Sequence, residues 1–338
     1  MSATLLRAGR LVVSLALGVF LLMAYRGSGI AAETLALEHT IALGEVRGRI
    51  DHLAIDLARH RVFVAELGNG TLGVVDLDKR QVVHRITGLK EPQGVAYFAA
   101  TDTIYLADGG DGVLHRHHGA DFTPLGSIKL GEDADNVRVD AQAHEILVGY
   151  GSALAVLDAS TGRKTGDFPL EGHPESFQLE AGGTRAFVNV PDARQVAVVD
   201  RAAGGQAAAW SVQDAQANFP MALDADNNRV MIVFRRPAEL AVLDAHEGKT
   251  IARLATCGDA DDIFFDAKRQ RAYISCGEGV IDVVQRQGDA YASIERVPTV
   301  PGARTALFVP ALDRLFLAVR ASPGAGAAIW VFRPTSSP

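Results

Sequence analysis

Short apolar segments, each followed by a polar turn, recur along the chain from residue 52 onward. Seven of them begin about 40–44 residues apart when the sequence is stacked on itself. They are residues 52–56, 94–98, 136–140, 176–180, 220–224, 262–266 and 305–309. Self-similarity at a fixed period of this size is the sequence signature of a repeat architecture. We therefore treat this period as the organising feature of the chain.

Every repeat continues with a second apolar segment, and several have a third that ends on aspartate. The second segments are residues 61–65, 103–107, 145–149, 185–189, 229–233, 271–275 and 314–318, and the third segments include 74–76, 156–158, 198–200 and 242–244. A turn then leads to a fourth strand. Four short strands in a unit of this length form one blade of a β-propeller. The pattern predicts an all-β fold, a seven-bladed β-propeller with four antiparallel strands per blade, as a single domain over residues 33–338.

The last repeat supplies only three strands, the third ending at residues 329–332. Residues 35–43 form an apolar segment that belongs to no other repeat. We expect this N-terminal strand to close the last blade, because closure of the ring hides two strand edges that would otherwise invite aggregation.

The fourth repeat contains Phe187-Val188-Asn189, followed a few residues later by Val-Ala-Val-Val-Asp at residues 196–200. This resembles the YVTN-repeat (YncE-like) seven-bladed propeller family, whose repeat reads Tyr-Val-Thr-Asn and then Val-x-Val-Ile-Asp. The resemblance extends over essentially all of residues 33–338 and implies a fold more than an activity. The WD40 alternative has less support, because neither Trp210 nor Trp330 is followed by Asp.

The first 32 residues differ from the rest. Arg7 and Arg10 precede an apolar run at residues 11–25, and small residues follow at 27–32. This is typical of a secretory signal peptide. An uncleaved anchor is the alternative, although the run is shorter than the ~20 residues that span a bilayer comfortably. We expect a periplasmic or secreted protein that contacts a membrane only through this segment, if it is retained.

Charge excludes one class of partner. The chain has 33 Lys+Arg against 40 Asp+Glu, for a net charge of −7, and no basic stripe. Nucleic acid is therefore not an expected partner. The chain also lacks Gly-x-Ser-x-Gly, His-Glu-x-x-His, Walker and dinucleotide-binding motifs. We expect a monomer.

The innermost strands of a propeller all start at one mouth of the central channel, so the loops before them converge there and are candidate binding loops. Acids and amides dominate these loops. The candidate ligand-binding residues are Asp51, His52, Gln93, Asp135, Asn136, Glu175, Asn218, Asp261, Asp262 and Arg304. Arg304 would neutralise the acids or clamp a substrate carboxylate.

A ring of carboxylates and amides suits a hard divalent cation such as Ca²⁺. It suits an ammonium-bearing ligand equally well, and it can also be a water-filled channel lining. The candidate metal ligands are Asp135, Asn136, Glu175, Asp261 and Asp262. No cofactor beyond a divalent cation is expected.

Two histidine features invite a chemical interpretation. His52 follows Asp51 and is the candidate catalytic residue, as a general base or a hydrogen-bond donor. A competing cluster, residues 115–118 with Asp121, puts His115 and His117 on one strand face, as a transition-metal pair requires. The repeat register places this cluster near the opposite rim, where a solvated turn is the simpler interpretation.

Cys257 precedes the first strand of the sixth repeat and Cys276 ends its second strand. Because neighbouring strands are antiparallel, both thiols reach the mouth side of the blade, and we predict a disulfide between them.

These observations favour a propeller that binds a small ligand, a cation or a protein partner at its acidic channel mouth. Two alternatives stay open: a metal-dependent hydrolase of lactonase type that uses the same mouth, and a non-catalytic scaffold in an envelope assembly. The expected partner is accordingly a small molecule or an envelope protein.

Overall fold

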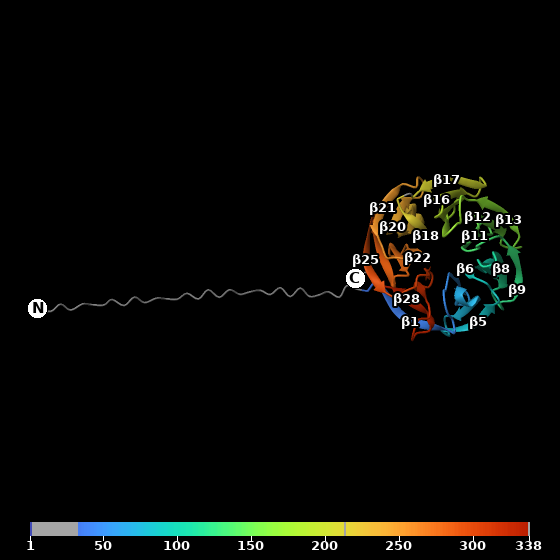
Figure 1. Cartoon of the computed structure of the whole chain (residues 1–338), viewed down its shortest axis with the longest axis horizontal. Coiled ribbons are helices and arrows are strands. Elements are labelled where there is room, and N and C mark those ends of the chain that lie inside the picture. The colour runs from blue at the N-terminus through green and yellow to red at the C-terminus, as the bar shows by residue number, and fades with distance from the viewer. Residues whose placement is uncertain (2–32, 213, 337–338) are drawn as a thin grey trace. The chain divides into compact units, whose positions relative to one another are not determined.

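The computed structural model describes Met1, residues 33–212 and residues 214–336. Within the compact unit Glu33–Pro338, the described residues form seven four-stranded antiparallel sheets. Figure 1 shows these sheets arranged as blades around a central opening. The prediction of an all-β, seven-bladed propeller with four strands per blade is confirmed.

The strands of blades 1 to 4 follow chain order from the channel outward. Blade 1 comprises β2 (Leu53–Asp56), β3 (Arg61–Glu66), β4 (Thr71–Asp76) and β5 (Gln81–Thr87). Blade 2 comprises β6 (Pro92–Phe98), β7 (Thr103–Asp108), β8 (Val113–His118) and β9 (Pro124–Lys129). Blade 3 comprises β10 (Val137–Asp140), β11 (Glu145–Tyr150), β12 (Ala153–Asp158) and β13 (Lys164–Pro169). Blade 4 comprises β14 (Phe177–Leu179), β15 (Arg185–Val190), β16 (Gln195–Asp200) and β17 (Gly205–Ser211).

The remaining blades complete the ring. Blade 5 comprises β18 (Gln216–Asp224), β19 (Arg229–Arg236), β20 (Ala238–Asp244) and β21 (Thr250–Ala255). Blade 6 comprises β22 (Ala260–Asp266), β23 (Arg271–Cys276), β24 (Val280–Gln287) and β25 (Ala290–Pro298). Blade 7 comprises β26 (Ala306–Val309), β27 (Arg314–Val319), β28 (Ala327–Pro334) and β1 (Leu35–Gly44). Three short 3₁₀ turns lie between strands of blades 1, 2 and 5: η1 (Leu67–Asn69), η2 (Ala99–Thr101) and η3 (Ala225–Asn227).

Blade 7 is closed by the N-terminal strand, as predicted. β1 pairs antiparallel with β28, with Leu35 opposite Pro334 and Ile41 opposite Ile329. Figure 1 shows the blue β1 beside the red β28. Every blade therefore has its fourth strand, and the ring has no gap between its first and last blades.

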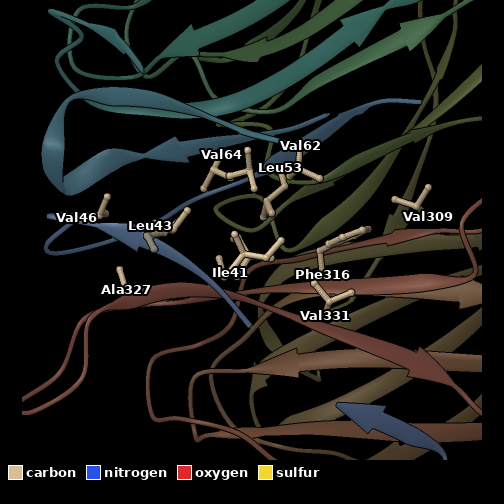
Figure 2. Close-up of a cluster of buried hydrophobic side chains, with 14 residues drawn as sticks. Ile41, Leu43, Val46, Leu53, Val62, Val64, Val309, Phe316, Ala327 and Val331 are labelled. Atoms are coloured by element: carbon tan, nitrogen blue, oxygen red, sulfur yellow. The ribbon is translucent and has the colours of Figure 1, made fainter. Parts of the chain in front are cut away.

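The core consists of wedges of apolar side chains between neighbouring blades. Figure 2 shows the wedge at the closure of the ring, where Ile41 and Leu43 of β1 pack with Val62 and Val64 of blade 1 and Phe316 of blade 7. Ile41, Leu43, Val62 and Val64 are completely buried. Strands covered by a blade on each face need apolar residues on both faces, which explains the weak alternation in the sequence.

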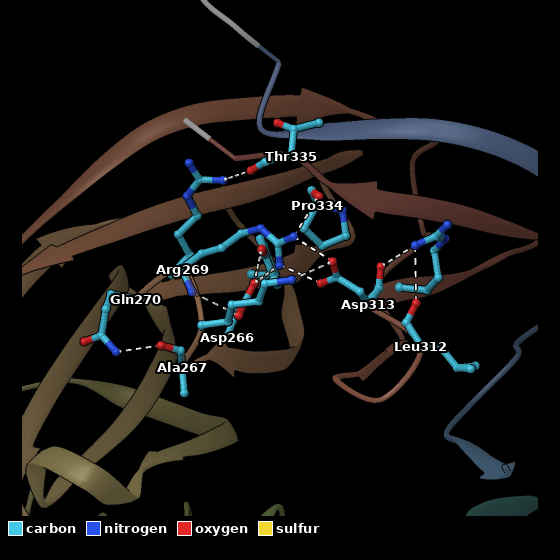
Figure 3. A network of polar contacts seen from close by, with 12 residues as sticks. Asp266, Ala267, Arg269, Gln270, Leu312, Asp313, Pro334 and Thr335 are labelled. Atoms are coloured by element: carbon cyan, nitrogen blue, oxygen red, sulfur yellow. Dashed lines mark hydrogen bonds and ion pairs between the residues drawn. The ribbon is translucent and has the colours of Figure 1, made fainter. Parts of the chain in front are cut away.

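Charged side chains join neighbouring blades on the rim opposite the mouth. Arg269, in the turn after the inner strand of blade 6, lies 2.8 Å from Asp266 and 2.6 Å from Asp313 of blade 7 (Figure 3). Arg59 makes the same link from blade 1, at 2.8 Å from Asp56 and 2.8 Å from Asp102 of blade 2.

The spacing Asp-x-x-Arg is common to both links. The arginine pairs with the aspartate of its own turn and with that of the next blade. Each link therefore fixes the orientation of one blade relative to its neighbour.

The predicted disulfide is present. Cys257 and Cys276 are bonded, with their Cα atoms 5.9 Å apart, within the usual range for a disulfide. Both residues are completely buried. The bond ties the loop before β22 to the end of β23.

The predicted signal peptide, residues 1–32, lies outside the described residues except for Met1. In the part of the chain that the structure describes, no helix has the length and apolar character needed to cross a membrane.

Candidate functional site

A polar cavity of about 200 Å³ lies where the loops before the inner strands converge. We call it the mouth cavity. Its lining comes from all seven blades and is dominated by charged and amide side chains. The lining residues are Arg49, Asp51, His52, Gln93, Asp133, Asp135, Asn136, His173, Glu175, Ser176, Phe219, Arg235, Asp261 and Arg304.

Three carboxylates reach this cavity from equivalent backbone positions. The N–H groups of Asp51, Asp135 and Glu175 each donate to a carbonyl of the second strand of their own blade, at 2.7–2.9 Å. A close approach between blades positions the second of them, because a Cβ at Gly94 would lie only 1.9 Å from the Asp135 carbonyl oxygen. The repeat itself therefore brings residues far apart in sequence to one opening.

Two arginines of the mouth cavity are already paired. Arg304 Nη1 lies 2.7 Å from Asp259 Oδ1, and Arg304 Nε lies 2.9 Å from Asp261 Oδ2. Arg235 also pairs with Asp261, and its guanidinium lies 4.2 Å from the ring centroid of Phe219. These contacts neutralise Asp259 and Asp261, and only the charge of Arg235 also acts, weakly, on Glu175 of blade 4.

His52 lies among three carboxylates. Its Nε2 is 3.7 Å from Asp51 Oδ1 and 3.9 Å from Asp135 Oδ1, and its Nδ1 is 3.8 Å from Asp262 Oδ1. Burial acts to lower the pKa of His52, but the three carboxylates together outweigh it and raise the pKa to about 9. His52 is therefore a cation at neutral pH. In that form it donates hydrogen bonds and cannot accept a proton as a general base.

Asp135 and Glu175 lack an arginine or lysine partner among the described residues. Asp135 is only 8% exposed, and its Oδ1 is buried without a hydrogen-bond partner. Burial raises the pKa of Asp135 to about 6, against the opposing charge of His52. Burial and then the neighbouring acids raise the pKa of Glu175 to about 8. These two carboxyl groups form the part of the site that a bound cation would stabilise.

A second cavity of about 510 Å³ follows the channel between the inner strands of all seven blades. His52 lines both cavities. Asp262 faces this channel cavity, where its Oδ2 accepts the Ala306 N–H at 2.8 Å. Burial raises the pKa of Asp262 to about 7, while His52 and that N–H oppose the shift. Farther along, apolar side chains such as Leu223 and Phe265 line the channel.

The structure brings most of the predicted ligand-binding residues together. Those at the mouth cavity are Asp51, His52, Gln93, Asp135, Asn136, Glu175, Asp261 and Arg304. Asp262 lines the channel cavity instead. Asn218 joins neither group: it is completely buried, and its Nδ2 donates to Asn189 Oδ1 at 3.0 Å and to the Gln195 carbonyl at 3.1 Å. That side chain holds blade 5 to blade 4.

Arg235 and Phe219 were not among the sequence candidates. Arg235 lies near the end of β19, a second strand, and those strands run back to the mouth side of the blade. The candidates were chosen from residues before the first strands only. Because second strands end at the mouth, the position of Arg235 near the end of β19 is the sequence feature that identifies it as a mouth residue.

The predicted cation ligands do not form a compact group. The described residues contain one set of three His, Cys, Asp or Glu side chains whose ligand atoms all lie within 4.8 Å of one another, and it consists of Asp108, Asp111 and His115 of blade 2. Asp261 is held by two arginines. A Ca²⁺ ion at the mouth stays a prediction.

The structure corrects the expected position of the 115–118 cluster. Asp108 pairs with Pro92 at the mouth-side end of blade 2, and His115 pairs with Leu106, two residues from that end. His118 pairs with Thr103 at the opposite end, where the whole run was expected. A six-residue strand rises about 17 Å from its first residue to its last, so its two ends lie near opposite rims.

Comparison with known proteins supports the fold and goes no further. No family model and no curated protein matches the chain. Among solved structures, a chain described as Kuenenia stuttgartiensis hydrazine synthase has a similar structure, with a TM-score of 0.76 and 13% sequence identity. The match covers 89% of this chain and 99% of that one. At this level of identity the similarity shows a shared propeller architecture, and the YVTN-repeat family stays a resemblance.

Proposed function

We propose that this propeller binds a small organic cation, an ammonium compound, at its mouth cavity. The single observation that carries the proposal is the buried Asp135 carboxylate, which has one oxygen without a hydrogen-bond partner and faces the cavity beside the unpaired Glu175. Leaving a buried charged acceptor unsatisfied costs about 1–3 kcal/mol or more. An ammonium group supplies the hydrogen-bond donor that Asp135 Oδ1 lacks, and a further positive charge for the acids at this side of the mouth.

The spacing of the acids supports an ammonium ion over a bare metal ion. Ca²⁺ needs 6–8 oxygen ligands at about 2.3–2.6 Å. No three acids of the mouth cavity place their ligand atoms within 4.8 Å of one another among the described residues. A polyatomic cation reaches separated carboxylates through different N–H groups. The cavity of about 200 Å³ is smaller than the ~300–1,000 Å³ of drug-sized sites, so the ligand is small.

The hydrolase and scaffold alternatives have no comparable support. A lactonase mechanism with His52 as general base requires a neutral imidazole, whereas the surrounding carboxylates keep His52 charged at neutral pH. His52 suits the other role considered for it, that of a hydrogen-bond donor. A scaffold in an envelope assembly stays a prediction.

The proposed location is the periplasm or the extracellular space. The Cys257–Cys276 disulfide supports it, because structural disulfides persist in oxidising compartments and are rare in the cytosol.

Calorimetric titration of the purified protein with methylammonium, ethanolamine and putrescine, and with Ca²⁺ for comparison, tests the proposal. We expect saturable binding of at least one amine, weakened at least tenfold by Glu175→Gln or Asp135→Asn. Asp226→Asn is the matched control, because Asp226 is exposed in η3 on the opposite rim. Absence of amine binding at tens of millimolar, or equal binding by all variants, would overturn it. Tight Ca²⁺ binding that the same variants abolish would replace the ammonium ligand by a metal ion.

A further inference from the structure

Blade 2 contains a second group of ligand-type side chains, separate from the mouth cavity. Asp108 ends β7, Asp111 lies in the following turn and His115 lies on β8. Their ligand atoms all lie within 4.8 Å of one another, and His115 Nε2 is 3.8 Å from Asp108 Oδ2. None of the three lines the mouth cavity.

Two of these ligand atoms are buried and unsatisfied. Asp111 Oδ1 and His115 Nε2 are inaccessible to solvent and have no hydrogen-bond partner. Buried polar atoms are nearly always paired, and each exception calls for a physical explanation. The two unsatisfied atoms belong to neighbouring residues of the same group, which points to a shared missing partner.

Two backbone N–H groups hold the Asp108 carboxylate in a fixed orientation beside these unsatisfied atoms. Its side chain is completely buried, its Oδ1 accepts the Glu91 N–H at 2.7 Å and its Oδ2 accepts the Lys90 N–H at 2.7 Å. A carboxylate offers about four lone pairs, so Oδ2 retains one for a further bond. Backbone donors that orient a carboxylate in this way are typical of the groups that surround metal ligands.

His115 is not a product of the repeat. At the matching position of the third strand, four other blades carry small residues, Gly73, Ala155, Ala197 and Ala241, whereas blade 6 carries Asp282 and blade 7 carries Trp330. Of the seven blades, only blade 2 has a histidine there. The repeat therefore accommodates different side chains at this position, and in blade 2 that side chain is a potential metal ligand.

We propose that Asp108, Asp111 and His115 bind a first-row divalent transition metal ion such as Zn²⁺. An imidazole nitrogen with two carboxylates suits Zn²⁺ better than the hard cations Ca²⁺ and Mg²⁺, which take oxygen ligands. Bonds of about 2.0–2.2 Å place tetrahedral ligands ~3.4 Å apart, so the 3.8 Å between His115 and Asp108 and the separations to Asp111, which are within 4.8 Å, must contract when the ion binds.

The experiment is a calorimetric Zn²⁺ titration of the chelator-stripped full-length protein, repeated with Co²⁺ to record its visible absorption. We expect one tightly bound equivalent and a Co²⁺ spectrum of a nitrogen- and oxygen-ligated site. His115→Ala and Asp111→Asn should each weaken binding at least tenfold. His118→Ala is the matched control, because His118 lies on the same strand at the opposite rim.

Melting curves of the metal-free variants separate loss of ligands from loss of folding, and Asp111→Asn exchanges only one atom of the side chain. No Zn²⁺ binding by the wild-type protein, or equal binding by His115→Ala, would overturn the proposal. Binding that Glu175→Gln abolishes and His115→Ala preserves would assign the metal to the mouth cavity and equally contradict it.

Discussion

His52 Nδ1 lies 3.8 Å from Asp262 Oδ1, although His52 precedes the inner strand of blade 1 and Asp262 belongs to blade 6, two blades away in the ring. The same imidazole lies 3.9 Å from Asp135 of blade 3 on its other side. The cationic ring therefore connects three blades across the channel. Protonation of His52 and ionisation of the surrounding acids are therefore coupled, because each charge shifts the pKa of the others.

This arrangement predicts an unusual pH dependence of stability. The pKa is raised to about 9 for His52, about 8 for Glu175, about 7 for Asp262 and about 6 for Asp135. Unfolded chains have values of about 6.5 for His, 4.3 for Glu and 3.9 for Asp. The folded protein therefore holds these protons more tightly, and the resulting stability is lost as the pH rises through the folded values.

We expect the Tm to fall between pH 5 and pH 9 at low salt. Glu175→Gln should flatten this slope, and Asp226→Asn should leave it unchanged. Carboxylates on the opposite rim act the other way, but at lower pH, since Arg269 is the main cause that lowers the pKa of Asp313 to about 2. Differential scanning calorimetry across the range provides the measurement. A Tm that is constant or rises from pH 5 to pH 9 would contradict this interpretation.

Arg304 should be important for stability, because it pairs with two mouth acids. Arg304→Met leaves Asp261 with Arg235 as its remaining arginine partner, and loss of one partner from a mostly buried pair is expected to cost about 2–4 kcal/mol. Adding Asp261→Asn should recover part of this loss. Arg47→Met is the control, since that arginine is 84% exposed and should contribute less than about 0.5 kcal/mol. Equal urea midpoints for the two single variants would show that the mouth pairs contribute no more than a surface pair.

Closure by β1 should contribute strongly to stability. Ile41 is completely buried at the closure wedge, so Ile41→Ala is expected to cost about 2–5 kcal/mol. Leu37 on the same strand is 45% exposed, and Leu37→Ala should cost less than about 0.5 kcal/mol. Chemical denaturation of both variants checks the difference. Similar losses would mean that β1 contributes through backbone pairing and not through its buried face.

The disulfide should stabilise the protein by restricting the unfolded chain. Cys257 and Cys276 are separated by 19 residues, and a loop of this size corresponds to about 3 kcal/mol. We expect the Cys257→Ala/Cys276→Ala variant to lose about this amount in denaturant titrations, and reduced wild-type protein to behave similarly. Thiol titration of the unfolded, unreduced protein should find the two cysteines oxidised. Two free thiols there would contradict the bond.

The sequence predicted the parts of the molecule that depend on backbone periodicity. The blades, the closure by residues 35–43 and the Cys257–Cys276 bond all follow from the order and direction of short strands. The gathering of Asp51, Asp135 and Glu175 follows for the same reason, since one backbone hydrogen bond repeats at each of them.

Side-chain pairing and orientation could not be predicted in this way. Asn218 lies near the start of the inner strand β18, yet its side chain points between blades because Asn189 offers a buried partner. Arg235 reaches the mouth from a second strand and takes up the charge of Asp261. The orientation of each of these side chains depends on which hydrogen-bond or ion-pair partner lies closest in the folded structure.

The pairing of β1 with β28 also sets an order of events during folding. Blades 1 to 6 consist of neighbouring hairpins that can form as soon as each has been synthesised. Blade 7 requires one of the earliest strands to wait for one of the latest, and contacts between such distant segments form slowly because closing a long loop costs entropy. Until β28 emerges, Ile41 and Leu43 belong to an unpaired apolar strand, which makes the nascent chain vulnerable to aggregation until its final blade is complete.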